Sequence, residues 1–478
     1  MIVSRLEAAG PGHPLASPGE WLDAATVVVA VRKRARELRG SLRPGQAVGV
    51  AGGEAGWQLI QLLAALEAGH EVLACNGGWW PRERDAVLER LRPGWLLEAD
   101  GHLRPLPTEP TEPTDHTEPT RSSPTNPARP ALGDGGEIGS PRLWLGTAAS
   151  FGEPMPFGWD KEQLDRFWLM PDPDISPGQT VVISGDVGHA PSLRFALGAL
   201  FAGAAVRFVD RKALLATLGV VGAVGAVDGT PIDHLCTTPP LLRRALHQLH
   251  RRQRPVAVVG RTVLHQGSWR PHEHDGWPTL LSGLVQARVS ATEAAGWVLH
   301  GEQPAPGVTL RIAPQEPGRT GDPTTGERPS EGSLFISGPV TATTGPAGIR
   351  PGPGWDSGDL AERDGSGAVR WQRRRRDHFE VDGLAVDPLE VEAALGSHPL
   401  VAEVVIAPRP HPERGNVVVA VVVPANPEWP PFVEDLAEVS AALGAHCRVE
   451  ALAIVDDVPL NAAGAVHRRL VNYEEAGR

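Results

Sequence analysis

The sequence predicts an α/β protein, with a large N-terminal domain of parallel crossover units plus a β-rich subdomain, followed by a small mobile α+β C-terminal domain. Three observations support this fold class. Short apolar strands alternate with amphipathic helices over the first part of the chain, which is typical of parallel crossover units. A turn-rich stretch of alternating strands comes next, and a compact series of helices and strands follows it.

The first crossover unit is predicted after a helix over residues 21–42. Residues 47–51 are apolar and follow a Pro-Gly turn, which indicates a buried strand. Residues 57–68 carry apolar side chains at helical spacing up to a glycine, and residues 71–75 form the next apolar run. Strand, helix and strand in this order make one parallel unit.

Two more crossover units and a β-rich region are predicted further along the chain. The second unit consists of residues 181–183, 192–201 and 205–209, and the third of residues 214–218, 234–237, 240–250 and 256–259. The β-rich region contains alternating strands at residues 308–312 and 333–337. In the last unit, helices are predicted at residues 388–395 and 432–443, and strands at 401–407, 417–423 and 451–455. This last series has the size of a small domain.

Residues 105–130 differ in kind from the rest. Thr-Glu-Pro-Thr recurs there with almost no large apolar side chain. Such a segment cannot bury enough surface to offset its ordering entropy, so a disordered Thr/Pro-rich loop is predicted. The alternating pattern resumes on both sides, which places the loop inside a domain.

Composition limits the class of partner. A chain of 478 residues is too long for one core, and its net charge of -12 argues against a general binder of nucleic acid or anionic membranes. Small molecules or proteins are the expected partners. The cysteines, at positions 75, 236 and 447, have no paired spacing, which indicates neither disulfides nor a zinc knuckle. Residues 1–20 lack a signal-peptide core and the longest apolar tract is short of a membrane span, so a soluble cytoplasmic protein is expected.

One stretch combines a carboxylate with arginines. Residues 354–360 read Gly-Trp-Asp-Ser-Gly-Asp-Leu, and residues 373–377 read Arg-Arg-Arg-Arg-Asp one short hairpin later. A carboxylate accepts hydrogen bonds from a ribose diol, and guanidinium groups fit phosphate oxygens, so the pair suits a nucleotide. The alternative is a hairpin with an acidic turn and a solvated basic face.

Three further motifs flank this stretch in a fixed order. Residues 147–155 read Thr-Ala-Ala-Ser-Phe-Gly-Glu-Pro-Met, residues 289–293 Val-Ser-Ala-Thr-Glu, and residues 459–465 Pro-Leu-Asn-Ala-Ala-Gly-Ala. Together the five motifs resemble those of the adenylate-forming superfamily of AMP-dependent synthetases and ligases. That superfamily includes acyl-CoA synthetases and the adenylation domains of peptide synthetases. Individually, the first motif also fits an ordinary turn between strands, and Thr-Glu fits a helix N-cap.

The resemblance implies a role for each matched position. By this resemblance, the nucleotide-binding residues of the chain would be Thr147, Ser150, Gly152, Thr292, Asp359 and Arg374. Asp359 would hold both ribose hydroxyls, Thr292 would lie near the α-phosphate, and Glu293 would bind magnesium. Thr292, Glu293 and His189 are the expected catalytic residues, with His189 either at the acyl pocket or purely structural.

The resemblance also implies the domain boundaries. Residues 1–373 would form the N-terminal domain, residues 374–376 a hinge with Arg376 at its pivot, and residues 377–478 the small domain. The implied cofactors are ATP or AMP and Mg²⁺, with CoA or a carrier-protein phosphopantetheine as the acyl acceptor. The implied substrate is a small carboxylic acid.

Two departures change the expected activity. Met155 and Ala465 occupy the two positions where the family carries lysines that offset charge on the phosphates. The site is therefore expected to hold a nucleotide or acyl-adenylate better than it makes one. Two functions follow: activation or transfer of a carboxylic acid to a thiol or amine, or a non-catalytic role as a ligand- or carrier-protein-binding regulator or scaffold.

Overall fold

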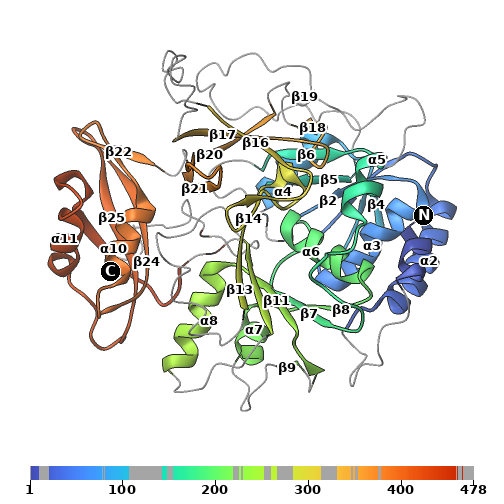
Figure 1. The fold of residues 1–478 in the computed structure, drawn as a ribbon, viewed down its shortest axis with the longest axis horizontal. Helices are drawn as coiled ribbons and strands as arrows, with labels where there is room; N and C mark the ends of the chain where they lie inside the picture. Colours follow the sequence, from blue (N-terminus) through green and yellow to red (C-terminus); the bar gives the residue numbers. More distant parts are fainter. Residues whose placement is uncertain are drawn as a thin grey trace.

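The computed structural model describes residues 2–9, 21–77, 79, 81–106, 143–147, 154–218, 226–227, 230–251, 260–265, 284–313, 331–345, 348–349, 354–374, 378–458, 460 and 466 (Figure 1). The predicted Thr/Pro-rich loop lies almost entirely outside them, as does the predicted strand at residues 256–259. Figure 1 shows a large α/β part with the C-terminal elements packed at one end of it.

The first sheet has the strand order β19-β18-β6-β5-β2-β1-β3-β4. Its strands are β1 (Ala47–Val50), β2 (Glu71–Ala74), β3 (Trp95–Leu97), β4 (Leu103–Pro105), β5 (Leu143–Gly146), β6 (Pro156–Trp159), β18 (Thr344–Gly345) and β19 (Gly348–Ile349). β1 pairs in parallel with β2 and β3, and β2 with β5. The first predicted crossover unit is therefore present.

The second sheet has the order β15-β14-β13-β12-β11-β7-β8. Its strands are β7 (Thr180–Ile183), β8 (Ala205–Phe208), β11 (His234–Thr237), β12 (Arg261–His265), β13 (Leu284–Val289), β14 (Leu299–His300) and β15 (Gln303–Pro304). All pairs from β8 to β13 are parallel. The second predicted crossover is present. In the third, β11 and α8 lead to β12, and the strand predicted at residues 256–259 lies outside the described residues. A small antiparallel pair, β9 (Ala226–Val227) with β10 (Thr230–Pro231), accompanies them.

Helices fill the space around the two sheets. They are α1 (Ile2–Ala8), α2 (Ala24–Ser41), α3 (Ala55–Ala68), α4 (Pro81–Leu91), α5 (Lys161–Gln163), α6 (Ala190–Phe201), α7 (Arg211–Leu218) and α8 (Pro239–Arg251). α3 and α6 are apolar nearly all round, and their buried side chains share one continuous core with β1 and β7. A helix without a polar face must be covered on every side, which explains their place between the sheets.

α2 begins later than the sequence pattern predicts. The Asp23 side chain accepts a hydrogen bond from the Thr26 backbone N–H at 2.7 Å, so the helix starts at Ala24 rather than at Trp21. Trp21 is instead buried beside the β7–β8 side of the second sheet. A capping aspartate thus outweighs the apolar periodicity in setting the helix start.

The β-rich region is a four-stranded antiparallel sheet of order β16-β17-β20-β21. Its strands are β16 (Thr309–Ala313), β17 (Glu331–Ser337), β20 (Trp355–Arg363) and β21 (Val369–Arg374). The motif at residues 354–360 thus forms the start of β20, and the arginine run begins at the end of β21. Both strands predicted in this region are present as strands.

The C-terminal elements enclose a core of their own. They are β22 (Phe379–Val381), β23 (Leu384–Val386), α10 (Pro388–Gly396), β24 (Val401–His411), β25 (Gly415–Pro424), α11 (Val433–Ala441) and β26 (Val449–Ile454). One buried cluster draws all of its residues from this region, among them Val381, Leu395, Ile406, Val422 and Leu436. Across the portion of the chain that the structure describes, no helix is both long and apolar enough to cross a membrane.

Candidate nucleotide-binding site

The candidate site begins at the carboxyl ends of the parallel strands in the second sheet. Ser184 follows β7, Thr237 ends β11, and Ser290 follows β13. The hydroxyl oxygens of Ser184 and Thr237 are 2.5 Å apart and form a hydrogen bond. In open parallel sheets ligands bind at this edge, because the loops that follow the strands gather there.

The Thr-Glu motif forms a tight turn at this edge. β13 leads into a short 3₁₀ helix, Thr292–Ala294, and Thr292 and Glu293 are 9% and 7% exposed. Ala295 then takes a left-handed conformation with φ of 52°, which ends the helix after one turn. A helix does start here, but its N-cap is Ala291 and no side chain caps it, so Thr292 is the first helical residue and not the N-cap. The acid in its first turn, Glu293, is buried.

Asp359 lies on β20, with Arg374 directly opposite it on β21. Asp359 is 2% exposed, and its backbone N–H donates to Ser357 Oγ at 3.1 Å. Gly354 begins the motif with φ of 99°, and a Cβ there would lie 2.4 Å from the Ile336 carbonyl oxygen. In the sequence the acid and the arginine are one hairpin apart, and the β20–β21 register puts these two positions across from each other.

The Thr-Glu turn and β20 are joined through one backbone residue. The Ala342 N–H donates to the Glu293 carbonyl oxygen at 2.9 Å, and the Ala342 carbonyl accepts from Trp355 Nε1 at 2.8 Å. The Trp355 ring also meets Phe157 of β6 edge to face, with centroids 5.2 Å apart. Three elements far apart in sequence, β6, the Thr-Glu turn and β20, are thereby fixed to one another.

The motif at residues 147–155 connects the antiparallel strands β5 and β6. Thr147 closes the base of this loop, since its N–H donates to the Met155 carbonyl at 3.0 Å and its Oγ1 accepts from the Met155 N–H at 2.9 Å. The Met155 side chain is half-buried against the main core. Ser150 and Gly152 fall outside the described residues, as do Arg376 and Ala465.

His189 precedes the first turn of α6, and its Nδ1 is 3.4 Å from Ser192 Oγ. Close by is Asp186, which the sequence did not single out as a site residue. Burial raises the pKa of the Asp186 carboxyl to about 6, although the N–H groups of Gly188 and Gly77 donate to it. The signal for such a residue is an acid two positions before a glycine in a strand-to-helix loop, which sequence alone cannot distinguish from a solvated turn.

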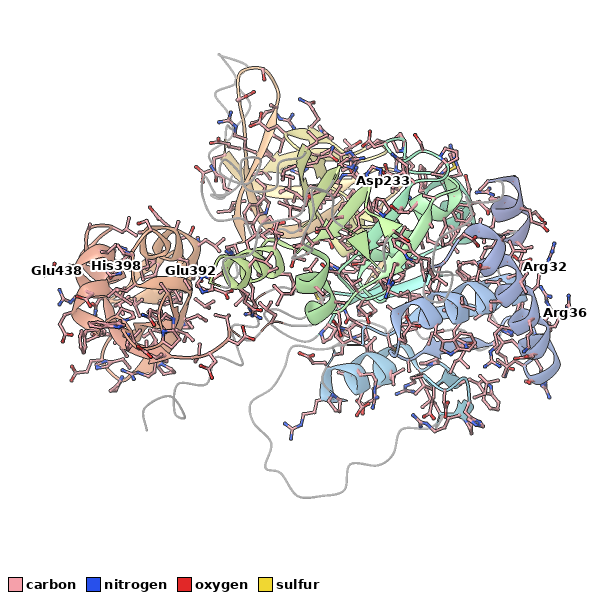
Figure 2. The ribbon with its side chains drawn as sticks, turned by 90° about the horizontal axis from the view of Figure 1, so that it is seen from below. Arg32, Arg36, Asp233, Glu392, His398 and Glu438 are labelled. Carbon is pink, nitrogen blue, oxygen red and sulfur yellow. The ribbon has the colours of Figure 1, made fainter. Side chains whose placement is uncertain are left out.

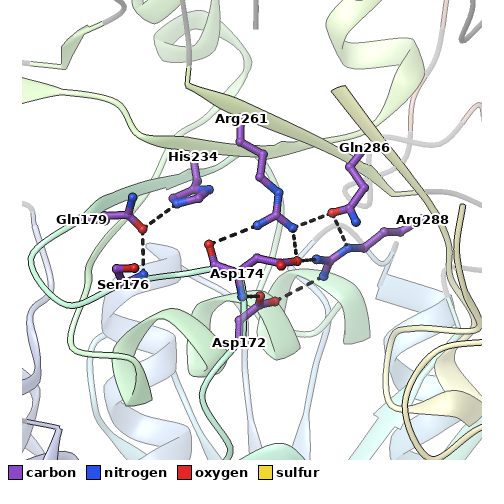
Figure 3. A network of polar contacts seen from close by, with 8 residues as sticks. All are labelled: Asp172, Asp174, Ser176, Gln179, His234, Arg261, Gln286 and Arg288. Atoms are coloured by element: carbon purple, nitrogen blue, oxygen red, sulfur yellow. Dashed lines mark hydrogen bonds and ion pairs between the residues drawn. The ribbon is translucent and has the colours of Figure 1, made fainter. Parts of the chain in front are cut away.

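A buried charge network lies against the strand that carries the Thr-Glu turn (Figure 3). Arg288 of β13 is fully buried and pairs with Asp172 at 3.3 Å and with Asp174 at 3.3 Å. Its guanidinium lies 4.9 Å from the centroid of the Trp297 ring, a cation–π distance. Arg261 of β12 extends the network by contacting Asp174 at 2.7 Å.

The network affects the protonation of Asp172 and of the nearby His300. The Arg288 guanidinium holds the pKa of Asp172 below its usual range despite burial. Burial, with Arg288 nearby, lowers the pKa of His300 to about 4, so that ring is neutral at pH 7. Because buried charges must keep their partners, β13 is held in one position just before the Thr-Glu turn. The network therefore supports the site without forming part of it.

Two buried acids of this region, Asp359 and Glu293, carry the kind of oxygen ligands that a nucleotide and its metal require. A buried carboxylate at Asp359 suits a ribose diol, and Glu293 offers an oxygen ligand of the kind magnesium prefers. Magnesium commonly binds one or two carboxylates and completes its shell with water and substrate phosphates. No group of three or more His, Cys, Asp or Glu side chains poised for a metal occurs in the ranges that the structure covers.

Comparison with known proteins identifies the C-terminal region first. Residues 390–465 match the family model of the AMP-binding enzyme C-terminal domain. An acetyl-coenzyme A synthetase of Deinococcus radiodurans is 34% identical over 122 residues, which is 26% of this chain and 19% of that protein. The 4-coumarate–CoA ligase-like 1 of Arabidopsis thaliana is 35% identical over 120 residues, 25% of this chain and 22% of that protein. The matched region thus spans about a fifth of the length of these curated relatives.

The fold as a whole extends the similarity. The crystal structure of the anthranilate CoA ligase AuaEII in complex with anthranoyl-AMP superimposes with a TM-score of 0.70 at 15% identity, covering 98% of this chain and 96% of the other. At this identity the match establishes the fold, including the predicted combination of a large N-terminal and a small C-terminal domain. Together, these matches agree with the resemblance drawn from the motifs: the C-terminal region is similar to the AMP-binding enzyme C-terminal domain and to parts of CoA ligases, and the whole chain has the fold of an anthranilate CoA ligase.

Proposed function

We propose that this protein binds an adenosine nucleotide and activates or transfers a carboxylic acid through an acyl-adenylate to a thiol or amine acceptor. The observation that carries this proposal is the buried Asp359 carboxylate across from Arg374, joined through Trp355 and Ala342 to the Thr292–Glu293 turn. A buried carboxylate needs partners of its own, and a ribose diol would add donors at this position.

Each proposed role follows from the side chain at that position. Asp359 would accept from both ribose hydroxyls, and Glu293 would hold Mg²⁺, which supplies positive charge beside the phosphates when bound. Thr292 and Thr147 keep hydroxyls that can donate to phosphate oxygens, and His189 would line the acyl pocket. CoA or a carrier-protein phosphopantetheine would supply the thiol.

Charge stabilisation is the weak part of this site. Attack of a carboxylate on the α-phosphate brings two anions together, and removing one positioned donor typically slows such a reaction roughly 100- to 1,000-fold. Met155 stands at one lysine position and packs against the core, and Ala465 stands at the other. We therefore propose that this protein holds a nucleotide or an acyl-adenylate better than it synthesises the acyl-adenylate.

Calorimetric titration with AMP, and with ATP plus Mg²⁺, tests nucleotide binding directly. Pyrophosphate exchange against a panel of carboxylic acids then tests adenylation. Binding with measurable exchange supports the full proposal. Absence of binding by both nucleotides would overturn it.

The half-buried Met155 at a lysine position favours a second candidate, a non-catalytic relative that binds a ligand or carrier protein and regulates or scaffolds. Exchange in a Met155→Lys and Ala465→Lys double variant separates the two. Exchange gained in the variant shows that the rest of the site is competent for adenylation. If neither the parent protein nor the double variant catalyses pyrophosphate exchange, and both still bind AMP, the non-catalytic role is favoured.

A further inference from the structure

One arginine of the large domain is buried against the C-terminal domain. Arg244 lies on α8 and is 6% exposed. Its Nε is 3.4 Å from Glu403 Oε2 and 2.8 Å from Asp457 Oδ1, and its Nη2 donates to the Val458 carbonyl oxygen at 2.6 Å. These three partners all belong to the C-terminal domain, so a single guanidinium connects the two domains.

The partners come from two separate places in that domain. Glu403 is on β24, just after a register shift between Val401 and Glu403, and it is 6% exposed. Asp457 and Val458 follow β26 and directly precede the motif at residues 459–465. The arginine therefore contacts both the sheet of the C-terminal domain and the chain at the start of its last motif.

The helix that carries Arg244, α8, is connected to the candidate site through β11. α8 follows β11 directly, and the Leu242 N–H donates to the Thr238 carbonyl oxygen at 3.0 Å in the first turn of the helix. Thr237, one residue earlier, is hydrogen-bonded to Ser184 at the sheet edge. Arg244 thus links the position of the C-terminal domain to the loop that borders the site.

We propose that Arg244 is a positioning residue, an ionic clamp that sets the orientation of the C-terminal domain and of the segment that begins at residue 459. A buried guanidinium and a buried carboxylate are costly to separate, because each would lose its charge partner. Any other orientation of the domain must break all of these contacts together. The clamp depends on the domain contact alone and stands whether or not the protein makes adenylates.

Limited proteolysis measures how often the clamp opens. The run Arg373 to Arg376 offers trypsin four adjacent sites at the predicted domain boundary, the first two at the end of β21, and a cut there is recognised by the masses of its products. Where opening is fast relative to cleavage, the cleavage rate follows the population of the open form. We expect Arg244→Ala and Glu403→Gln each to raise that rate about tenfold or more, because each removes one member of a buried pair.

The matched control is Arg414→Ala. Arg414 pairs with Asp382 at 2.7 Å and with Glu450, and all three residues lie within the C-terminal domain. This variant loses an arginine with two acidic partners yet leaves the contact between domains intact. Its cleavage rate at residues 373–376 is expected to match that of the parent protein.

Orientation is measured independently by fluorescence transfer. Figure 2 shows Arg36 at the far end of the large domain and Glu438 on the C-terminal domain, and both side chains are exposed. Dyes on Arg36→Cys and Glu438→Cys would report the distance, because Cys75, Cys236 and Cys447 are all buried. A broader or shifted distance distribution after Arg244→Ala, in protein whose thermal unfolding remains cooperative, supports the clamp.

A double variant tests whether Arg244 and Glu403 act together. If Arg244 and Glu403 act as one unit, the double variant Arg244→Ala, Glu403→Gln should be cleaved at residues 373–376 little faster than either single variant. The proposal is overturned if folded Arg244→Ala protein keeps the parent's cleavage rate and distance distribution. It is equally overturned if Arg414→Ala produces the same increase.

Discussion

At the scale of single residues, two acids of the candidate site region have different environments. Asp359 lies on a strand opposite an arginine position, whereas Asp186 lies in a loop where burial dominates its pKa. The sequence points to Asp359 because that residue belongs to a motif with two glycines. It does not point to Asp186, because burial is a property of the folded chain and no local pattern encodes it.

Asp359→Asn is expected to weaken AMP binding about 10- to 100-fold, since a hydrogen bond to a charged group contributes roughly 1.5–3 kcal/mol. Isothermal titration with AMP measures the change. Glu362→Gln, on the same strand but outside the motif, serves as the control and should leave the affinity unaltered. Equal affinities for the parent and the Asp359 variant would exclude the assigned role.

Asp186 provides a pH test. Its pKa in the folded protein is raised from 3.8 to about 6, so its contribution to stability is fully present below about pH 4 and is lost as the pH rises through 6. A rise of this size corresponds to about 3 kcal/mol. Asp186→Asn cannot ionise, so its Tm relative to the parent should rise between about pH 4 and 6 and level off above that range.

Thermal scans of both proteins across this range check the prediction. A difference in Tm between Asp186→Asn and the parent that stays constant across this pH range would show that burial does not raise the pKa of the Asp186 carboxyl.

At the scale of elements, glycines fix how β20 enters the site. Gly354 and Gly358 both have positive φ, at 99° and 75°. They differ in surroundings, because a Cβ on Gly354 would lie 2.4 Å from the Ile336 carbonyl oxygen, whereas one on Gly358 would meet nothing within 4 Å. The first glycine is needed for close approach, and the second only for its backbone conformation.

Gly358→Ala is therefore expected to cost about 1–2 kcal/mol, the usual penalty for a left-handed non-glycine residue. Gly354→Ala should cost about 1–3 kcal/mol more, because the strand must also move away from β17. Thermal unfolding of the two variants gives the comparison, and AMP titration shows whether the movement reaches Asp359. Similar losses in both variants would mean that β20 absorbs the added methyl group without shifting.

At the scale of the whole molecule, none of the buried clusters in the described residues combines side chains from both parts of the chain, which agrees with a two-domain arrangement. The buried cluster of the C-terminal domain runs from Val381 to Val449, and the main cluster extends only to Val369. A unit with its own core can fold alone. The boundary at residues 374–376 stays a prediction that this separation supports.

A fragment of residues 377–478 is accordingly expected to unfold cooperatively on heating, because its core is complete. A fragment starting at residue 401 is the control, since it lacks β22, β23 and α10 and with them Val381, Val391 and Leu395 of that core. Circular dichroism during heating distinguishes them. A gradual, non-cooperative transition of the longer fragment would place the boundary elsewhere.

The sequence by itself determined the first two parallel crossovers, the order of the C-terminal elements and the motifs at residues 292–293 and 354–360, because periodicity, turn residues and spacing are local properties of a chain. Tertiary structure alone decided three other features: the Ala342 link between motifs, the Arg288 network beneath β13, and the contact of Arg244 with Glu403. The partners in these contacts can be distant in sequence: Arg244 and Glu403 are 159 positions apart. Each partner lies in a segment that by itself looks like an ordinary strand or surface helix. An arginine in an amphipathic helix is expected to face water, and only the packing of a second domain against α8 turns Arg244 into a buried charge that needs partners.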